Sequence, residues 1–234
     1  MKKFSIAKIN DNVYKKNNYL ETNYKGLAKI LYYFNHKILE IGVKKKYNKY
    51  LVEIGGGAKP HLKYMDTNSI KEYTIIDDIK YKKRILELSK ENKKISFKFI
   101  NYKKFKLPKK KYTRLIASHS FEHFNNFEKN FLKLLPSLKI DSILSIALPC
   151  DPGITWRLLQ YLYYFKQKKT YGWENFKEKD LSHSRDHCTP VQNIQKVINY
   201  YFKNKKNYFF PFLVPSINLN IFLIIQTKIK DFRY

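Results

Sequence analysis

Three consecutive glycines, Gly55, Gly56 and Gly57, follow closely on an acidic residue, Glu53. Glycine lets the backbone approach a ligand closely, and a carboxylate beside the turn can accept hydrogen bonds from a cationic or hydroxyl-bearing group. The third glycine of a dinucleotide-binding G-x-G-x-x-G loop would fall where Pro60 stands, and no Gly-Lys-Ser/Thr follows for a P-loop. The pattern therefore predicts a ligand-binding turn of neither phosphate-binding type, and a plain strand-ending turn is the alternative.

Two adjacent acids, Asp77 and Asp78, follow the apolar stretch 73–76, at 24 and 25 residues after Glu53. In Rossmann folds an acid about 20 residues beyond the glycine turn binds ribose hydroxyls. The spacing predicts that one of these carboxylates holds a ribose. A solvated carboxylate at a strand end is the alternative.

Histidines and an acid cluster in the segment 117–124, which contains His119, Glu122 and His123. Imidazole titrates near neutrality, so these groups can supply a general base that takes a proton from a hydroxyl or an amine. Capping of the following helix is the alternative role for Glu122 and His123.

A second histidine-containing segment carries His183, Arg185, His187 and Cys188. Arg185 can clamp a carboxylate or a phosphate, and His187 can accept a proton. The His-x3-His spacing with one cysteine suggests a metal site but lacks a fourth ligand at a characteristic spacing. We therefore expect no metal, and interpret the segment as a substrate-facing loop.

Short apolar runs alternate with helix-length stretches and position these residues. Strands are predicted over 50–54, 73–76, 95–100, 114–118, 142–148, 208–214 and 219–227, and helices over 21–43, 81–91, 127–138, 156–165 and 191–202, with a short one after Pro60. The order predicts an α/β, Rossmann-like, mostly parallel seven-stranded sheet with a C-terminal β-hairpin and helices on both faces. Residues 1–48 are expected to form an N-terminal lead-in and helical cap, and residues 49–234 one domain in which 151–190 form a lid.

In this order the motifs resemble those of the class I S-adenosylmethionine (SAM)-dependent methyltransferases. The run 117–124 is similar to a segment of their methyltransferase-11/23-like, small-molecule type. The resemblance covers residues 50–150 well and 151–234 loosely. It implies SAM as the cofactor, bound by Glu53 and the glycine turn, with Asp78 favoured over Asp77 as the ribose ligand.

Three further cofactor contacts follow from the resemblance. Asn101 stands where these enzymes usually have an acid that contacts the adenine amine, and its side-chain oxygen can still accept that bond. Ser118 and His119 lie in the loop that floors the SAM site in this family.

The predicted reaction is direct methyl transfer to an oxygen or nitrogen of a small molecule. His123 or His187 removes the proton, and Arg185 holds an anionic group of the substrate. The resemblance favours a sugar or lipid-linked glycan hydroxyl of cell-envelope biosynthesis. One alternative is an RNA or protein methyltransferase, and the positive net charge is its only support. The Asn/Asp-Pro-Pro-aromatic tetrapeptide of many nucleic-acid methyltransferases is missing. The other is a SAM-binding protein without catalysis.

The composition is that of a globular protein, with a hydrophobic fraction of 44% and a formal net charge of +28. The lysines lie in scattered runs and accompany residue types encoded by A- and T-rich codons, so we expect no specific nucleic-acid partner. No apolar run reaches the roughly 18 residues of a membrane span, which leaves peripheral membrane contact open. The polar start predicts no signal peptide, and the two cysteines predict free thiols, both in keeping with a cytoplasmic protein of undetermined oligomeric state.

Overall fold

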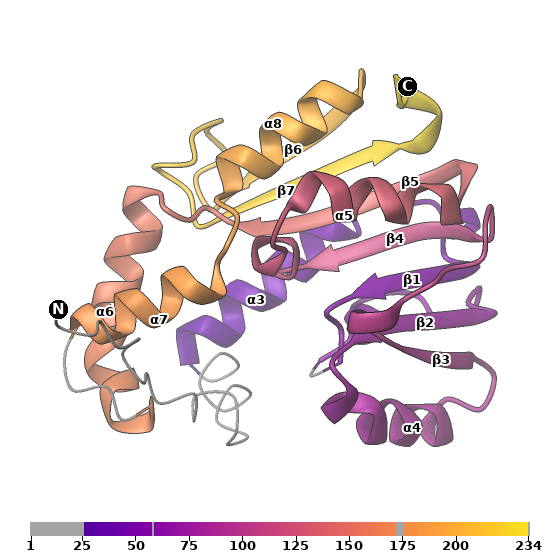
Figure 1. The fold of residues 1–234 in the computed structure, drawn as a ribbon, viewed down its shortest axis with the longest axis horizontal. Helices are drawn as coiled ribbons and strands as arrows, with labels where there is room; N and C mark the ends of the chain where they lie inside the picture. The colour runs from indigo at the N-terminus through magenta and orange to yellow at the C-terminus, as the bar shows by residue number, and fades with distance from the viewer. Residues whose placement is uncertain (1–25, 58, 172–175, 234) are drawn as a thin grey trace, which may run out of the picture.

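The computed structural model describes residues 26–57, 59–171 and 176–233 (Figure 1). The predicted lead-in over residues 1–17 and the first residues of the predicted N-terminal helix lie outside this part. Seven strands form one sheet in the order β3-β2-β1-β4-β5-β7-β6. They are β1 (Tyr50–Ile54), β2 (Glu72–Asp77), β3 (Ser96–Asn101), β4 (Tyr112–Ser118), β5 (Leu138–Pro149), β6 (Lys205–Phe210) and β7 (Phe222–Lys228).

Strands β1 to β5 pair in parallel, whereas β7 lies antiparallel between β5 and β6. The predicted mostly parallel sheet with a C-terminal antiparallel hairpin is therefore confirmed. The main helices are α3 (Gly26–Leu39), α4 (Lys82–Glu91), α5 (Phe127–Leu134), α6 (Ile154–Tyr171), α7 (Phe176–Asp186) and α8 (Val191–Tyr201).

Side chains that alternate along the strands fill apolar layers on both faces of the sheet. Val52 of β1 packs in the large cluster that contains Phe131 of α5 and Ile194 of α8, whereas its neighbour Leu51 packs in a cluster with Ile85 of α4. On the latter face, α3 packs against β5 and β7 (Figure 1). Helices therefore cover both faces, as predicted.

The helix α3 is attached to the sheet by a buried charge. Arg114 of β4 has no exposed surface, and its Nη2 atom lies 2.7 Å from Glu40 Oε1 and donates a 3.0 Å hydrogen bond to the Leu39 carbonyl. Gln226 of β7 donates to the same carbonyl at 2.9 Å. The end of α3 is thus fixed to two strands of the sheet.

Two predicted elements differ in extent from the structure. The strand predicted over 208–214 is β6, which ends at Phe210 because Pro211 has no N–H to donate to a ladder. The helix predicted over 127–138 ends at Leu134, a 3-10 turn follows around Pro136, and β5 begins at Leu138.

The segment 151–190 differs most from expectation, because α6 and α7 occupy most of it. Phe176 of α7 contacts the rings of Tyr161 and Tyr164 on α6. We interpreted the stretch from residue 183 as a loop, but it is helical through Asp186. Its mostly charged and polar side chains give no apolar periodicity from which a helix could be predicted. Figure 1 shows this helix pair beyond the ends to which the parallel strands point.

No helix in the described ranges is long and apolar enough to cross a membrane.

Candidate functional site

A cavity of about 810 Å³ lies at the carboxyl ends of the parallel strands. Ligands of open α/β sheets bind at this edge. Its walls come from α3 (Ala28, Leu31, Tyr32), from the ends of β1 and β2 (Gly55, Asp77, Asp78, Tyr81), from the segment after β4 (His119, Ser120, Glu122, His123), from α6 (Trp156, Leu159, Gln160, Tyr163), and from α7 and the residues after it (Lys179, His183, Arg185, Asp186, His187, Cys188). The strand ends and the helix pair therefore share one space.

The glycine turn brings backbone directly to this cavity. Gly55 has a φ of +77°, and a Cβ atom added to it would lie 2.6 Å from Ser120 Cβ. Gly57 donates a 2.6 Å hydrogen bond to Asp77 Oδ2, and a Cβ on Gly56 would collide with the Glu53 carboxylate. Gly55 lines the cavity, while Gly56 and Gly57 pack behind it.

Glu53 lies behind the turn and does not line the cavity. It is 1% exposed and accepts hydrogen bonds from the His61 backbone N–H at 3.0 Å and from the Tyr73 hydroxyl at 2.7 Å. Burial raises the pKa of this carboxyl to about 7. In the structure these hydrogen bonds hold the segment around the turn in place. The cofactor contact that the sequence analysis expected of Glu53 stays a prediction.

The two predicted ribose ligands both line the cavity. Asp77 accepts backbone hydrogen bonds from Gly57 and from Asp78, each at 2.6 Å, and so ties the end of β2 to the glycine turn. Asp78 accepts a 3.0 Å hydrogen bond from the Lys80 backbone. Asp77 therefore connects two elements through its hydrogen bonds, whereas the hydrogen bond of the Asp78 side chain reaches a residue just two positions further along the chain.

Two more predicted cofactor contacts, Asn101 and Ser118, also do not line the cavity. The Asn101 side chain accepts a 3.0 Å hydrogen bond from the Lys103 backbone, and the neighbouring Tyr102 and Phe105 line the cavity in its place. Ser118 Oγ lies 3.4 Å from Asn35 Nδ2 on α3.

His119 lines the cavity in a largely enclosed environment. Its Nε2 atom lies 3.0 Å from Asn35 Nδ2, and its ring packs edge-on against Tyr32 and Phe222. Burial lowers the pKa of His119 to about 3, so the ring is neutral near pH 7.

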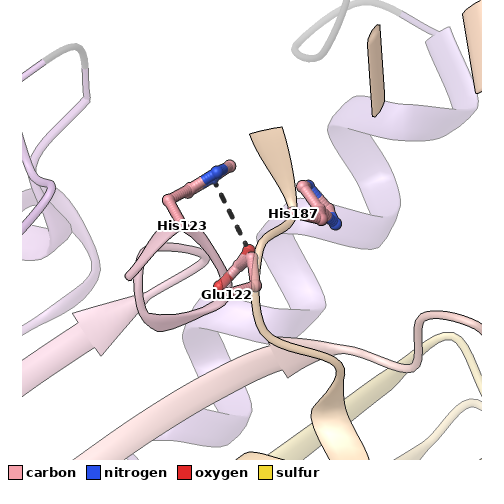
Figure 2. A group of neighbouring side chains, drawn as sticks. All are labelled: Glu122, His123 and His187. Atoms are coloured by element: carbon pink, nitrogen blue, oxygen red, sulfur yellow. Dashed lines mark ion pairs between the residues drawn. The ribbon is translucent and has the colours of Figure 1, made fainter. Parts of the chain in front are cut away.

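Glu122, His123 and His187 come together on the cavity wall (Figure 2). Glu122 is 3% exposed, and its Oε1 atom lies 3.9 Å from His123 Nε2. Its Oε2 atom has no hydrogen-bond partner among the described residues. Burial raises the pKa of this carboxyl to about 7. A buried carboxyl with a free oxygen and a pKa near neutrality is suited to exchange a proton with a ligand.

The helix pair supplies the other side of this wall. His187 Nδ1 and His183 Nε2 each lie 2.9 Å from Asp151 Oδ2. Burial lowers the pKa of His187 to about 4, which keeps its imidazole neutral near pH 7. Arg185 lines the cavity with an exposed side chain, so all three predicted catalytic residues, His123, His187 and Arg185, lie on its wall.

Polar residues on the cavity wall (Gln160, Lys179) and behind it (Asp151) were not predicted as site residues. Asp151 follows β5, and Lys179 of α7 is 3% exposed and donates to Gln160 Oε1 on α6 at 3.2 Å. The position of Asp151 after a strand at the ligand-binding edge was a usable signal. Lys179 and Gln160 had none, because Lys179 lies in an unpatterned polar stretch and Gln160 is a single polar residue in an apolar run.

The fold is that of the class I SAM-dependent methyltransferases, as the motif order implied. The plantazolicin methyltransferase BpumL, in complex with a pentazolic desmethylPZN analog and S-adenosylhomocysteine (SAH), matches with 17% identity over 92% of this chain and 90% of its own, at a TM-score of 0.58. A SAM-dependent methyltransferase of Thermotoga maritima, described as a possible histamine N-methyltransferase, matches with 12% identity over 92% of this chain and 97% of its own, at a TM-score of 0.55.

The CurJ carbon methyltransferase matches with 15% identity over 89% of this chain and a TM-score of 0.58, and this chain spans 57% of that structure. No protein-family model matches the chain, and no curated protein matches it in sequence. Identities this low establish the fold and leave the reaction to be argued from the site.

Proposed function

We propose that this chain is a SAM-dependent methyltransferase that methylates an oxygen or nitrogen atom of a small molecule. One observation carries the proposal. A single cavity at the carboxyl ends of the strands joins the turn at Gly55 and the acids Asp77 and Asp78 to the polar group of Glu122, His123 and His187. A cofactor site and an acceptor site thus face each other in one space.

The residues around the glycine turn fit the cofactor. A Cβ atom on Gly55 would clash with Ser120, and the buried Ser120 Oγ has no hydrogen-bond partner among the described residues. Asp78 and Asp77 offer carboxylate oxygens to ribose hydroxyls. When bound, SAM supplies a methyl group that its sulfonium already activates.

The chain's own contribution is to position the acceptor, exclude water and manage the proton. An acceptor hydroxyl or amine beside Glu122 can pass its proton to this carboxylate, whose pKa near neutrality suits the role. The helices α6 and α7 supply part of the cavity wall, where they can limit the access of water to the reacting groups. Most of the acceleration is expected from positioning and desolvation.

A sugar or lipid-linked glycan hydroxyl is the acceptor that we propose. The rings of Tyr32, Trp156 and Phe222 provide flat apolar walls for the C–H faces of a sugar, and Arg185 on the same cavity can hold a phosphate or carboxylate. Because α6 and α7 supply much of this wall, acceptor selectivity should reside in residues 151–190.

Calorimetry and transfer assays test the proposal in sequence. SAM and SAH should bind the purified, ligand-stripped protein, while NAD and ATP should not. Radiolabelled SAM should then label glycan or small-molecule fractions of a cell extract. Binding of NAD or ATP in place of SAM would refute the proposal. SAH binding without transfer to any fraction would indicate a non-catalytic SAM-binding protein, and transfer to RNA or protein fractions alone would exclude the small-molecule acceptor.

A further inference from the structure

Glu122, His123 and His187 offer ligand atoms that all lie within 4.8 Å of one another on the cavity wall. Two imidazoles and one carboxylate are a set that binds divalent transition metals and leaves coordination positions open. We propose that this group binds one divalent first-row transition-metal ion, with Glu122, His123 and His187 as its protein ligands.

Hydrogen bonds at the far side of both rings set the nitrogen that each histidine offers. His123 Nδ1 lies 2.9 Å from the backbone carbonyl oxygen of Asp186, and His187 Nδ1 lies 2.9 Å from Asp151 Oδ2. A carbonyl and an ionised carboxylate can only accept, so each Nδ1 carries a proton and Nε2 is the nitrogen that each ring can offer to an ion. Carbonyl and carboxylate partners of this kind orient metal-binding histidines and raise their basicity.

Glu122 supplies the third ligand. Its Oε2 atom is buried without a hydrogen-bond partner in the described part of the chain. The other oxygen, Oε1, lies 3.9 Å from His123 Nε2 and is the one that would bind the ion (Figure 2). Asp151 and Asp186 adjoin the two histidines, so three carboxylates of a chain with only 19 acidic residues meet here.

A second group, formed by Asp151, His183 and His187, also brings its ligand atoms within 4.8 Å. In this group both histidine rings already lie within hydrogen-bond distance of Asp151 Oδ2, at 2.9 Å. These hydrogen bonds explain why the three side chains lie close together. His187 belongs to both groups, and we assign Asp151 the task of orienting it.

An ion at this place would hold an oxygen or nitrogen of the acceptor in its open positions. That role rests on the proposed function, whereas ion binding rests on the geometry of the three side chains alone. Ligand atoms bound to one ion at about 2.1 Å lie roughly 3–3.5 Å apart, so the side chains must close by about 1 Å.

The test uses the full chain, stripped with a chelator and titrated with Co²⁺, whose visible absorption reports coordination, followed by metal analysis after dialysis against Zn²⁺ or Mn²⁺. We expect one equivalent of ion per chain. His123→Gln and Glu122→Gln should each weaken binding by about 10-fold or more, the scale seen even for outer-shell partners. The matched control His183→Gln should bind within a few-fold of wild type.

SAH calorimetry on each variant verifies folding and separates this inference from the proposed function. Wild-type protein that binds SAH but takes up no stoichiometric ion would overturn the metal site and leave the methyltransferase proposal standing. Ion uptake without SAH binding would do the reverse. Loss of the ion in His183→Gln but not in His123→Gln would place it at the second group and refute our assignment.

Discussion

Replacing Gly55 with alanine tests whether the glycine turn forms the cofactor site. The φ of +77° costs an alanine about 1–2 kcal/mol. The added Cβ would also lie 2.6 Å from Ser120 Cβ, well inside the 3.5–4.0 Å of a normal carbon contact, and such overpacking costs about 1–3 kcal/mol more. We expect a total loss of roughly 2–5 kcal/mol in stability.

Gly42 provides the matched control, because its φ is +71° but nothing lies within 4 Å of an added Cβ. Gly42→Ala should lose only the backbone part, about 1–2 kcal/mol, and bind SAH normally. In Gly55→Ala the turn and Ser120 must shift by about 1 Å to regain a normal contact, and SAH affinity should fall by about tenfold or more, equivalent to 1.4 kcal/mol. Chemical denaturation and calorimetry measure both quantities. Equal unfolding curves and equal SAH affinities for the two variants would refute the reasoning.

Three further predictions concern the acids and the basic clamp. Asp78→Asn should weaken SAH binding by about 10-fold or more with little effect on unfolding, and a silent Asp78→Asn beside a damaging Asp77→Asn would reverse our assignment. Arg185→Ala should leave SAH affinity within a few-fold of wild type but lower methyl transfer by about 10²-fold, and unchanged rates on the true acceptor would reduce Arg185 to a surface residue. Burial opposes ionisation of Glu40, yet His61 and Arg114 hold its pKa at about 2 against an ordinary 4.5. Its stabilisation, at most about 3 kcal/mol, is therefore complete above pH 4.5 and is lost as the pH falls toward 2. Unfolding at pH 2.5–6 should show a flatter acid dependence in Glu40→Gln, and identical slopes would contradict this.

The sheet could be predicted because each parallel strand is a short apolar run that ends in a recognisable turn. The run 50–54 coincides with β1, and the glycines and Asp77 end β1 and β2 where the pattern indicated. The hairpin was harder, since the register of β6 depends on where Pro211 interrupts the ladder. Chain order could not reveal that Arg114 lies buried under α3, because its partners come from distant segments.

The cavity wall could be predicted only in part, for the same physical reason. His123 and His187 were identifiable by residue type, but the value of Glu122 depends on its burial and on an oxygen left without a partner. The metal hypothesis was rejected for want of a ligand at a regular spacing along residues 183–188. The group that we propose instead combines His187 with Glu122 and His123, about sixty positions earlier, and no local spacing rule can detect such a grouping.

The buried pair of Glu40 and Arg114 also constrains how this sequence can change over generations. Exchanging Glu40 alone leaves the buried Arg114 charge without its carboxylate, at a cost of about 3–5 kcal/mol, which is a large part of the stability of an ordinary domain. Lineages that descend from this chain should therefore keep both residues or replace both with apolar ones. Covariation between positions 40 and 114 among related sequences would then reflect the contact that fixes α3. Because α3 lines the cavity, the same contact also fixes one cavity wall.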